Sequence, residues 1–530
     1  MNENYYVAPD QYSNVAVSPQ QPDEKKMRDF STLESVFAWI AFIGGYLFCR
    51  AFPVGKSPLG GFLFITMLFV ITAIVLKLKG CKFKALPIVL GLSAIAMSSA
   101  LIISNNGFIY FFSYSYSLVI YCYFIYAIAG NTLQRGLTDY LALDFFKAIF
   151  VTPFFAFSHL FKAMFTGKRK KGRKVVSKAL LGAAFAIVPT AIVVGLLSYD
   201  ENFSNTLSRI FDFEIDIFSH IVSLGFAIII GMYVFGLFIS SSDKLSENAI
   251  TVDGCKGAYS GMKIAPMVTI LVAAIPLLFV YVVFFISQMD YYISGFTGVL
   301  PENLSYAQYA REGFFQLCTV SVINLAIILL AVVFTKRKTE QPTLALKALT
   351  IIYSLFTLVL ISTAVAKMIM YIDYYGLTQK RVYATWFMFI LALVFIIIII
   401  KQFVPSLKAV AASFVVGVVL FAGLALSSVD TRIAEYNVDR YIEGTVQDFD
   451  VVTLYELGDA AVPEMVRLYK FMDEKHTGGF ISSTDSYKLE YLEKKLEARA
   501  DKAKADEGGI FSFNIPSARA EAALKEIGML

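Results

Sequence analysis

Long apolar runs separated by short polar segments fill the chain between residues 33 and 428. A helix needs about 20 mostly apolar residues to cross about 30 Å of hydrocarbon, and several runs approach or exceed that length without a charge. The pattern predicts about eleven transmembrane helices, at residues 33–52, 59–76, 85–104, 108–129, 176–198, 218–240, 264–287, 314–335, 344–371, 383–403 and 408–428. The predicted fold class is therefore an all-α, polytopic helical membrane protein.

The two ends of the chain are polar. Residues 1–30 have the composition of a disordered tail without a cleavable secretory signal, so the first span is expected to remain as an anchor. After Ser428 charged residues become frequent and no further span follows, which places a domain boundary there. Residues 429–530 are predicted to form a small extramembrane helical domain, with helices near 430–444, 459–475 and 484–504. The last of these alternates charge sign at helical spacing, which is typical of a solvated face; a surface for an envelope protein partner is the alternative.

Composition indicates that the chain lies in a lipid environment, and the charge distribution predicts its orientation in the membrane. Hydrophobic residues make up 57% of the 530 residues and charged residues only 16%, with a mean hydropathy of +0.64, so the chain needs lipid around it. Lys and Arg gather in alternate connections, most densely between Arg135 and Lys178. The positive-inside rule then predicts a cytoplasmic N-terminus. Because an odd number of spans separates the termini, we expect a plasma-membrane protein with an extracytoplasmic C-terminal domain.

The connection between the fourth and fifth predicted spans carries too many charges to cross the membrane and too many aromatic residues to be fully solvated. Residues 137–166 are therefore predicted to lie in the interface. A basic run follows, which anionic lipid head groups attract by about 1 kcal/mol per residue. It comprises Lys168, Arg169, Lys170, Lys171, Arg173 and Lys174. The run is either a topology signal or a docking site for lipid head groups or a partner.

The outer loop at residues 288–313 is richer in tyrosine and in charge than a connector requires. It is either an interfacial aromatic belt or a substrate-facing rim, in which an arginine would suit bidentate phosphate recognition. Lys367 lies near the outer edge of its span, where it could snorkel or act beside Asp373. The candidate functional rim comprises Tyr306, Tyr309, Arg311, Glu312, Lys367 and Arg381.

A polar stripe is predicted inside the eighth span. Gln316, Thr319 and Asn324 fall within roughly 140° of helical arc, so they share one side of the helix. Uncharged stripes of this kind either join neighbouring helices by hydrogen bonds or line a polar pathway.

Metal, cofactor and nucleotide chemistry have little support. The five cysteines form no CxxC pair and the three histidines lie far apart, so we predict no metal site. We also predict no cofactor and no nucleic-acid partner. Nucleotide-binding, zinc-protease and serine-hydrolase motifs do not occur. Acids of the C-terminal region could form a carboxylate site or a solvated helical surface, and their spacing fits no calcium loop: Asp430, Asp439, Asp448, Asp450, Glu456 and Asp459.

Five short segments carry a resemblance to a known family. The most specific is SYAQYAREGFFQL at 305–317; the others are YYGLT with Arg381 at 374–381, AEYNVDRY at 434–441, DAAVP at 459–463 and FNIP at 513–516. Together they resemble a bacterial family of polytopic membrane proteins known only as a domain of unknown function, of the 4153/4173 type. The resemblance implies bacterial origin and multi-pass architecture, and it implies no established activity.

Three functions remain open. The first is a non-enzymatic protein of the cell envelope that conducts a solute or organises envelope components, in contact with membrane lipids. The second is a membrane enzyme that acts on lipid-linked substrates at the outer face, and the third is a sensor or regulatory partner. A polar cavity at the midplane would favour transport. An outer groove at Arg311 and Lys367 would favour lipid chemistry, and a packed interior would favour a scaffold or sensor.

Overall fold

The computed structural model describes residues 29–50, 57–165, 215–287, 289, 306–337, 342–446, 449–478, 483–505 and 509–530, together with single positions between 182 and 203. These residues are helical or connect helices, apart from an isolated bridge between Ala265 and Thr335. Among them, ten helices are long and apolar enough to cross a membrane. The predicted fold class is confirmed, and the chain is a multi-pass helical membrane protein.

The ten candidate spans correspond to ten of the eleven predicted runs. They lie within α1 (Thr32–Arg50), α2 (Pro58–Leu78), α3 and α4 (Ala85–Ser98, Ala100–Ile103), α5 (Gly107–Ile128), α10 (Ile215–Ser242), α12 (Met267–Ser287), α14 (Tyr306–Phe334), α15 (Leu344–Tyr375), α16 (Gln379–Phe403) and α17 (Ala409–Leu426). The remaining predicted span, at 176–198, and the basic run at 168–174 lie outside the described residues, apart from single positions.

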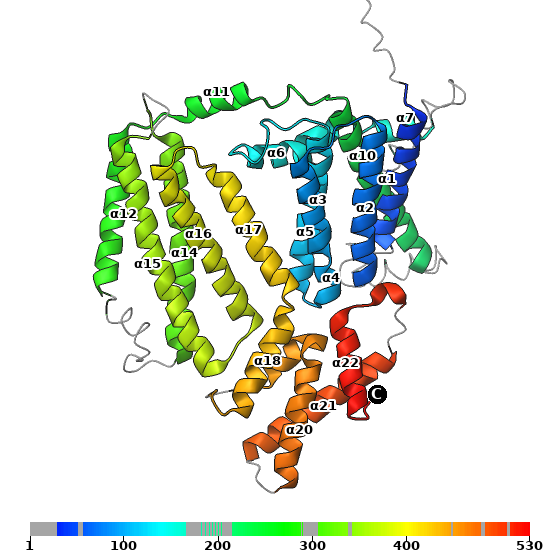
Figure 1. The fold of residues 1–530 in the computed structure, drawn as a ribbon, viewed down its shortest axis with the longest axis vertical. Coiled ribbons are helices and arrows are strands. Elements are labelled where there is room, and N and C mark those ends of the chain that lie inside the picture. Colours follow the sequence, from blue (N-terminus) through cyan, green and yellow to red (C-terminus); the bar gives the residue numbers. More distant parts are fainter. Residues whose placement is uncertain are drawn as a thin grey trace, which may run out of the picture.

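The spanning helices form two groups that stand side by side (Figure 1). One group contains α1, α2, α3, α5 and α10, and the other contains α12, α14, α15 and α16. Helix α17 lies between them, because its apolar side chains pack on α3, α4 and α5 as well as on α16. The Trp386 indole of α16 donates to the Leu420 carbonyl of α17 at 3.0 Å. Helix α17 thereby joins the two groups and leads into the C-terminal domain.

Small residues allow α1 and α10 to pack closely. A Cβ added to Gly45 would lie 2.8 Å from the backbone oxygen of Ala227, and one added to Gly231 would lie 3.1 Å from Cα of Phe42. In hydrocarbon, where apolar surface gains nothing by hiding from lipid, such close backbone approach is a main source of helix association. The second group adds hydrogen bonds, since the buried Tyr353 hydroxyl donates to the Ala274 carbonyl at 2.7 Å.

Short helices lie across the end of the layer at which α1 begins (Figure 1). The elements are α6 (Leu141–Phe146), the π-helical turn η1 (Lys147–Val151), the 3-10 turn η2 (Thr152–Phe155), α7 (His159–Met164) and α11 (Val252–Met262). In the segment predicted to be interfacial, Phe161 is buried whereas Phe154 is exposed. The segment therefore anchors one set of apolar side chains in the helix layer and presents another outward.

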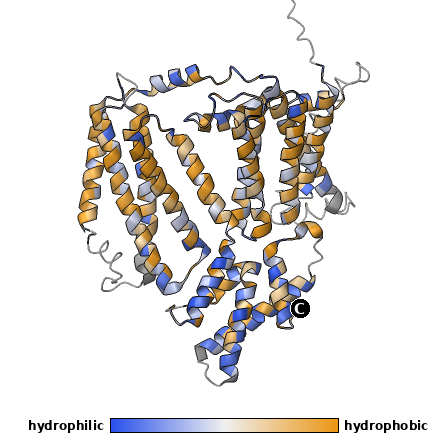
Figure 2. Cartoon of the chain, in the orientation of Figure 1, coloured by the Kyte–Doolittle hydropathy of each residue, from blue (hydrophilic) through white to orange (hydrophobic). Residues whose placement is uncertain are grey.

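The C-terminal helices lie at the opposite end of the layer and are more hydrophilic than the spans (Figure 2). They are α18 (Val429–Ile442), α19 (Val452–Glu456), η3 (Gly458–Ala461), α20 (Val462–Thr477), α21 (Ser483–Ala505), η4 (Ile510–Ser512) and α22 (Ile515–Glu526). Their shared core contains buried residues such as Val438, Leu454, Met465 and Leu496. Helices α18, α20 and α21 lie close to the predicted positions, and the sequence pattern did not predict α22.

Candidate functional site

Two adjoining cavities of about 300 and 420 Å³ lie where the C-terminal helices meet the ends of the spans. Both are lined by Asn105, Asp459, Arg499 and Lys502, so we treat them as one junction cavity. Further polar side chains come from α5, α16, α18, α19 and α22 or from the connections beside them: Asn106, Gln379, Tyr383, Asp430, Glu456, Asn514, Ser517 and Glu521. The cavity is therefore bounded by membrane helices on one side and by the C-terminal domain on the other.

Asp459 is the main connection across this cavity. Its Oδ1 accepts from Arg499 Nη1 at 3.0 Å, and its Oδ2 accepts from the Ser517 hydroxyl at 2.7 Å and from Asn105 Nδ2 at 3.2 Å. One carboxylate thus joins η3, α21, α22 and the loop before α5. Two buried polar atoms of its partners, Asn105 Oδ1 and Arg499 Nε, have no hydrogen-bond partner among the described residues. Such atoms favour a bound polar group, because leaving them unpaired is costly.

Asp430 makes a second connection, in the first turn of α18 just after α17 ends. It is 4% exposed and accepts from Asn106 Nδ2 at 3.0 Å and from Gln379 Nε2 at 3.0 Å. Burial raises the pKa of Asp430, and the hydrogen bonds from Asn106 and Gln379 act in the opposite direction. Asn106 also caps α5, since its side-chain oxygen accepts from the Phe108 amide at 2.9 Å. The same residue therefore begins a membrane helix and holds the C-terminal domain.

The loop between α15 and α16 is fastened to α18 by Asn437. The Asn437 side chain accepts from the Leu377 amide at 2.7 Å and donates to the Leu377 carbonyl at 2.8 Å. Gly376 has φ +78, and a Cβ there would lie 2.5 Å from Asn437 Oδ1. Both the backbone angle and the close approach require glycine. Arg440 of α18 adds an ion pair with Asp373, at 3.5 Å.

Two of the predicted rim residues, Arg381 and Lys367, have side chains within the described part of the structure. Arg381 donates to the Gly376 carbonyl, and its guanidinium lies 4.0 Å from the ring centroid of Tyr371, so it supports the loop beside the junction. Lys367 is 5% exposed within α15. The other four rim residues, Tyr306, Tyr309, Arg311 and Glu312, belong to the first turns of α14, and their side chains lie outside the described part of the structure.

The predicted polar stripe divides between two environments. Asn324 is buried and donates to the Thr357 hydroxyl of α15 at 2.9 Å, which is a helix-joining contact. Gln316 and Thr319 are exposed on α14, and the Thr319 hydroxyl donates to the Phe315 carbonyl of its own helix at 2.8 Å. The three side chains therefore do not share a common cavity wall among the described residues.

The C-terminal acids also divide. Asp430, Glu456 and Asp459 line the junction cavity, whereas Asp439 pairs with Arg467 and Asp450 caps the Val452 amide. Asp448 lies outside the described residues. No group of three or more His, Cys, Asp or Glu side chains in the described part of the chain is arranged to hold a metal ion. The cavity acids are instead engaged by amide, hydroxyl and guanidinium donors.

The sequence pattern did not single out the amide side chains of this cavity, which are Asn105, Asn106 and Gln379. A usable signal was present, because an Asn-Asn pair stands directly before an apolar run, the position at which an N-cap residue is expected. Lys502 was predicted only as part of a solvated face.

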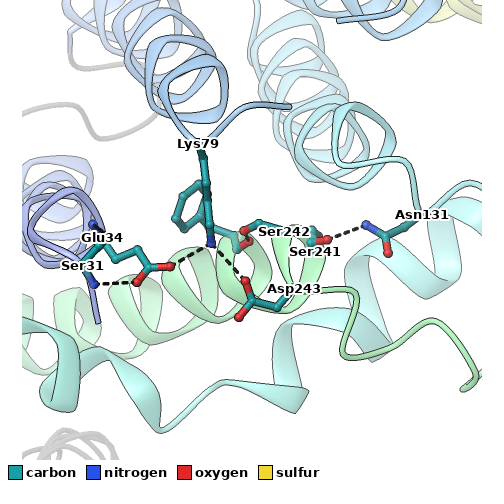
Figure 3. Close-up of polar contacts among 8 residues, drawn as sticks. Ser31, Glu34, Lys79, Asn131, Ser241, Ser242 and Asp243 are labelled. Carbon is teal, nitrogen blue, oxygen red and sulfur yellow. Dashed lines mark hydrogen bonds and ion pairs between the residues drawn. The ribbon is translucent and has the colours of Figure 1, made fainter. Parts of the chain in front are cut away.

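A separate ion cluster lies where α1 begins and where α2 and α10 end, and Figure 3 shows its contacts. Lys79, after α2, pairs with Glu34 of α1 at 2.9 Å and with Asp243, after α10, at 3.1 Å. Glu34 also accepts from the Ser31 amide, which completes the capping of α1. Nearby, Asn131 donates to the Ser241 carbonyl at 2.8 Å. These contacts tie three helix ends together.

Two pairs of the family-like segments meet at the junction. The α15–α16 loop meets AEYNVDRY through Asn437, and DAAVP meets the helix that follows FNIP through Asp459 and Ser517. The chain belongs to the DUF4153 family. The family, described as a domain of unknown function, matches residues 91–468, well over half of the chain. The resemblance to the 4153 type is thereby confirmed, and no curated protein and no solved structure matches the chain.

The DUF4153 match divides the junction cavity. It includes Asn105, Gln379, Asp430 and Asp459, whereas α21 and α22, with Arg499, lie beyond its end at residue 468. Apart from Pro58 of α2, the membrane side of the cavity and the first C-terminal helices therefore belong to the DUF4153 region, and the last two helices complete the cavity from outside that region.

Proposed function

We propose that this DUF4153 protein is a non-enzymatic component of the bacterial cell envelope that binds a small polar envelope component in the junction cavity. It would lie in the plasma membrane with its N-terminus in the cytoplasm and its C-terminal domain outside. The observation that carries the proposal is one polar cavity that contains unpaired buried atoms and is lined by Asp459 and Asn514 of two separate family-like segments. A ligand bound there would contact both the spans and the C-terminal helices, so its binding would affect both, as in a sensor.

The interior of the first helix group supports binding over conduction. A cavity of about 480 Å³ in this group is lined almost entirely by apolar side chains, most of them from α1, α2, α5 and α10. A polar solute that passed through it would lose its hydrogen bonds to water without replacement, at a cost of about 2–7 kcal/mol for each group. The polar junction cavity lies instead at the end of the spans.

The state of the cavity acids favours binding over catalysis. A general acid or base must be able to exchange a proton with a bound substrate. Asp459 already accepts from Arg499, Ser517 and Asn105, and Asp430 already accepts from two amide side chains. These carboxylates act as acceptors that position the walls of the cavity.

The wall chemistry suggests the class of ligand. Arg499 Nε and the Lys502 ammonium offer donors, while Asn105 Oδ1 and the carboxylates of Glu456 and Glu521 offer acceptors. A ligand with hydroxyl, amide and charged groups would match this mixture, and peptidoglycan fragments have all three. The exposed face of α21 remains a candidate surface for an envelope protein partner.

Titration of the full-length protein in nanodiscs with soluble disaccharide–peptide fragments of peptidoglycan tests the proposal. We expect saturable binding that Lys502→Ala weakens about tenfold, since a hydrogen bond to a charged group contributes about 1.5–3 kcal/mol. Lys494→Ala is the matched control, because Lys494 is exposed on the same helix and does not line the cavity. Absence of saturable binding, or equal weakening by both variants, would overturn the proposal.

A further inference from the structure

We propose that the cavity lined by α1, α2, α5 and α10 is a binding groove for one hydrocarbon chain of a bilayer lipid. The groove has a volume of about 480 Å³, within the range of about 300–1,000 Å³ that is typical of ligand pockets. Its walls include Ile43, Gly44, Met67, Ile71 and Val234. This site is independent of the junction cavity, and its failure would leave the proposed function untouched.

The dimensions of the groove suit a lipid chain. Its lining runs along α1 from Phe37 to Phe48, which is about 17 Å at 1.5 Å per residue. That length is about half of the 30 Å hydrocarbon thickness, and hence close to one leaflet. Ile43 of α1 and Met67 of α2 are 50% and 48% exposed, so the groove opens sideways between these two helices. A side opening in a pair of spans faces lipid chains directly.

The groove wall has little capacity to hold water by hydrogen bonds. Its hydroxyl and thiol groups are paired within the wall: Thr72 with Tyr121 at 2.9 Å, and Cys122 with Tyr233 at 3.6 Å. A water molecule needs two to four polar partners to be held in a cavity. An empty groove would forfeit the dispersion contacts of its whole lining. A hydrocarbon chain from the surrounding bilayer restores those contacts without leaving a polar group unpaired.

Two neighbouring glycines make the groove testable. A Cβ on Gly44 would have no atom within 4 Å, whereas one on Gly45 would press on the backbone of Ala227. Gly44→Leu therefore fills the groove without displacing α10. Met67→Trp at the mouth is an independent second block. The matched control is Gly417→Leu, because Gly417 of α17 also has open space around it and does not line the groove.

The experiment uses the full chain in nanodiscs of phosphatidylethanolamine and phosphatidylglycerol that carry a photoactivatable diazirine on one acyl chain. Adducts are mapped by mass spectrometry, with the exposed face of α12, at Val268 and Phe279, as the reference for ordinary lipid contact. We expect the groove peptides of α1 and α2 to be labelled more strongly than α12. Gly44→Leu and Met67→Trp should each reduce groove labelling several-fold and leave α12 labelling unchanged, while Gly417→Leu changes neither.

Two outcomes would overturn the inference. The first is groove labelling no stronger than that of α12, and the second is groove labelling that both blocking variants leave unchanged.

Discussion

Replacement of Asn437 by alanine should loosen the C-terminal domain from the membrane helices. Asn437 is 1% exposed, and both ends of its amide bond the backbone of Leu377. The substitution removes the donor and the acceptor together, while it leaves α18 intact because alanine is the best helix former. Its primary effect should therefore fall on the loop between α15 and α16.

The expected cost follows from what is left behind. The Leu377 amide and carbonyl both lose their partner, and each unsatisfied backbone group costs about 1–3 kcal/mol. Because Leu377 is only partly buried, water can reach some of the freed groups, and we expect a loss of about 2–4 kcal/mol. Glu435→Ala, on an exposed position of the same helix, should change stability by less than about 0.5 kcal/mol.

Hydrogen exchange of the full-length protein in nanodiscs measures this effect locally. Amides of the 374–378 loop and of α18 should exchange faster in Asn437→Ala than in the native protein or in Glu435→Ala. Gly376→Ala provides a coupled test, because its added Cβ would meet Asn437 Oδ1, and the double variant should cost less than the sum of the two single variants. Unchanged exchange in the loop, together with additive costs, would refute the role assigned to Asn437.

Three further predictions concern the end of the helix layer at which α1 begins and the orientation of the protein in the membrane. Burial raises the pKa of Asp144 in α6 to about 6. The stability that this carboxyl group contributes is therefore complete below its ordinary pKa of 3.8 and is lost as the pH rises through about 6. In thermal unfolding scans, Asp144→Asn should remove this loss of stability with rising pH, and an unchanged pH profile would contradict the prediction. Lys79→Met should lower the free energy of unfolding by about 3 kcal/mol because Glu34 and Asp243 lose their shared cation, and adding Glu34→Gln should recover part of the loss. An alkaline phosphatase fused after Leu530 should be active outside the cell, and activity only in the cytosol would reverse the predicted orientation.

The positions of the spans were predictable because the bilayer imposes the same length and polarity on each of them. Residues 409–426, for example, carry no charge and form α17 as the apolar run predicts. Helices outside the membrane were harder to predict. The short helix α22 contains several small and polar residues, and it depends on an Asn514 cap and on packing of Ala520 and Leu524 against its neighbours.

The junction cavity could not be predicted from the local pattern. Asn105 and Asp459 are 354 positions apart, and a stretch of sequence does not indicate which distant partner will accept a hydrogen bond. Arg381 is an example, because its sequence position beside a span predicts only a candidate place on a functional rim. The folded chain places it against Tyr371 and the Gly376 carbonyl, where it supports a loop.

The sequence by itself determined that this protein is a multi-pass helical membrane protein with a polar helical domain after its last span, because the thickness of hydrocarbon acts on each segment separately. Only the tertiary structure decided which polar residues meet. The packing of α17 between the two helix groups brings α18 against the ends of α5 and α16, and Asp430 and Asn106 become partners across 324 positions through that packing alone.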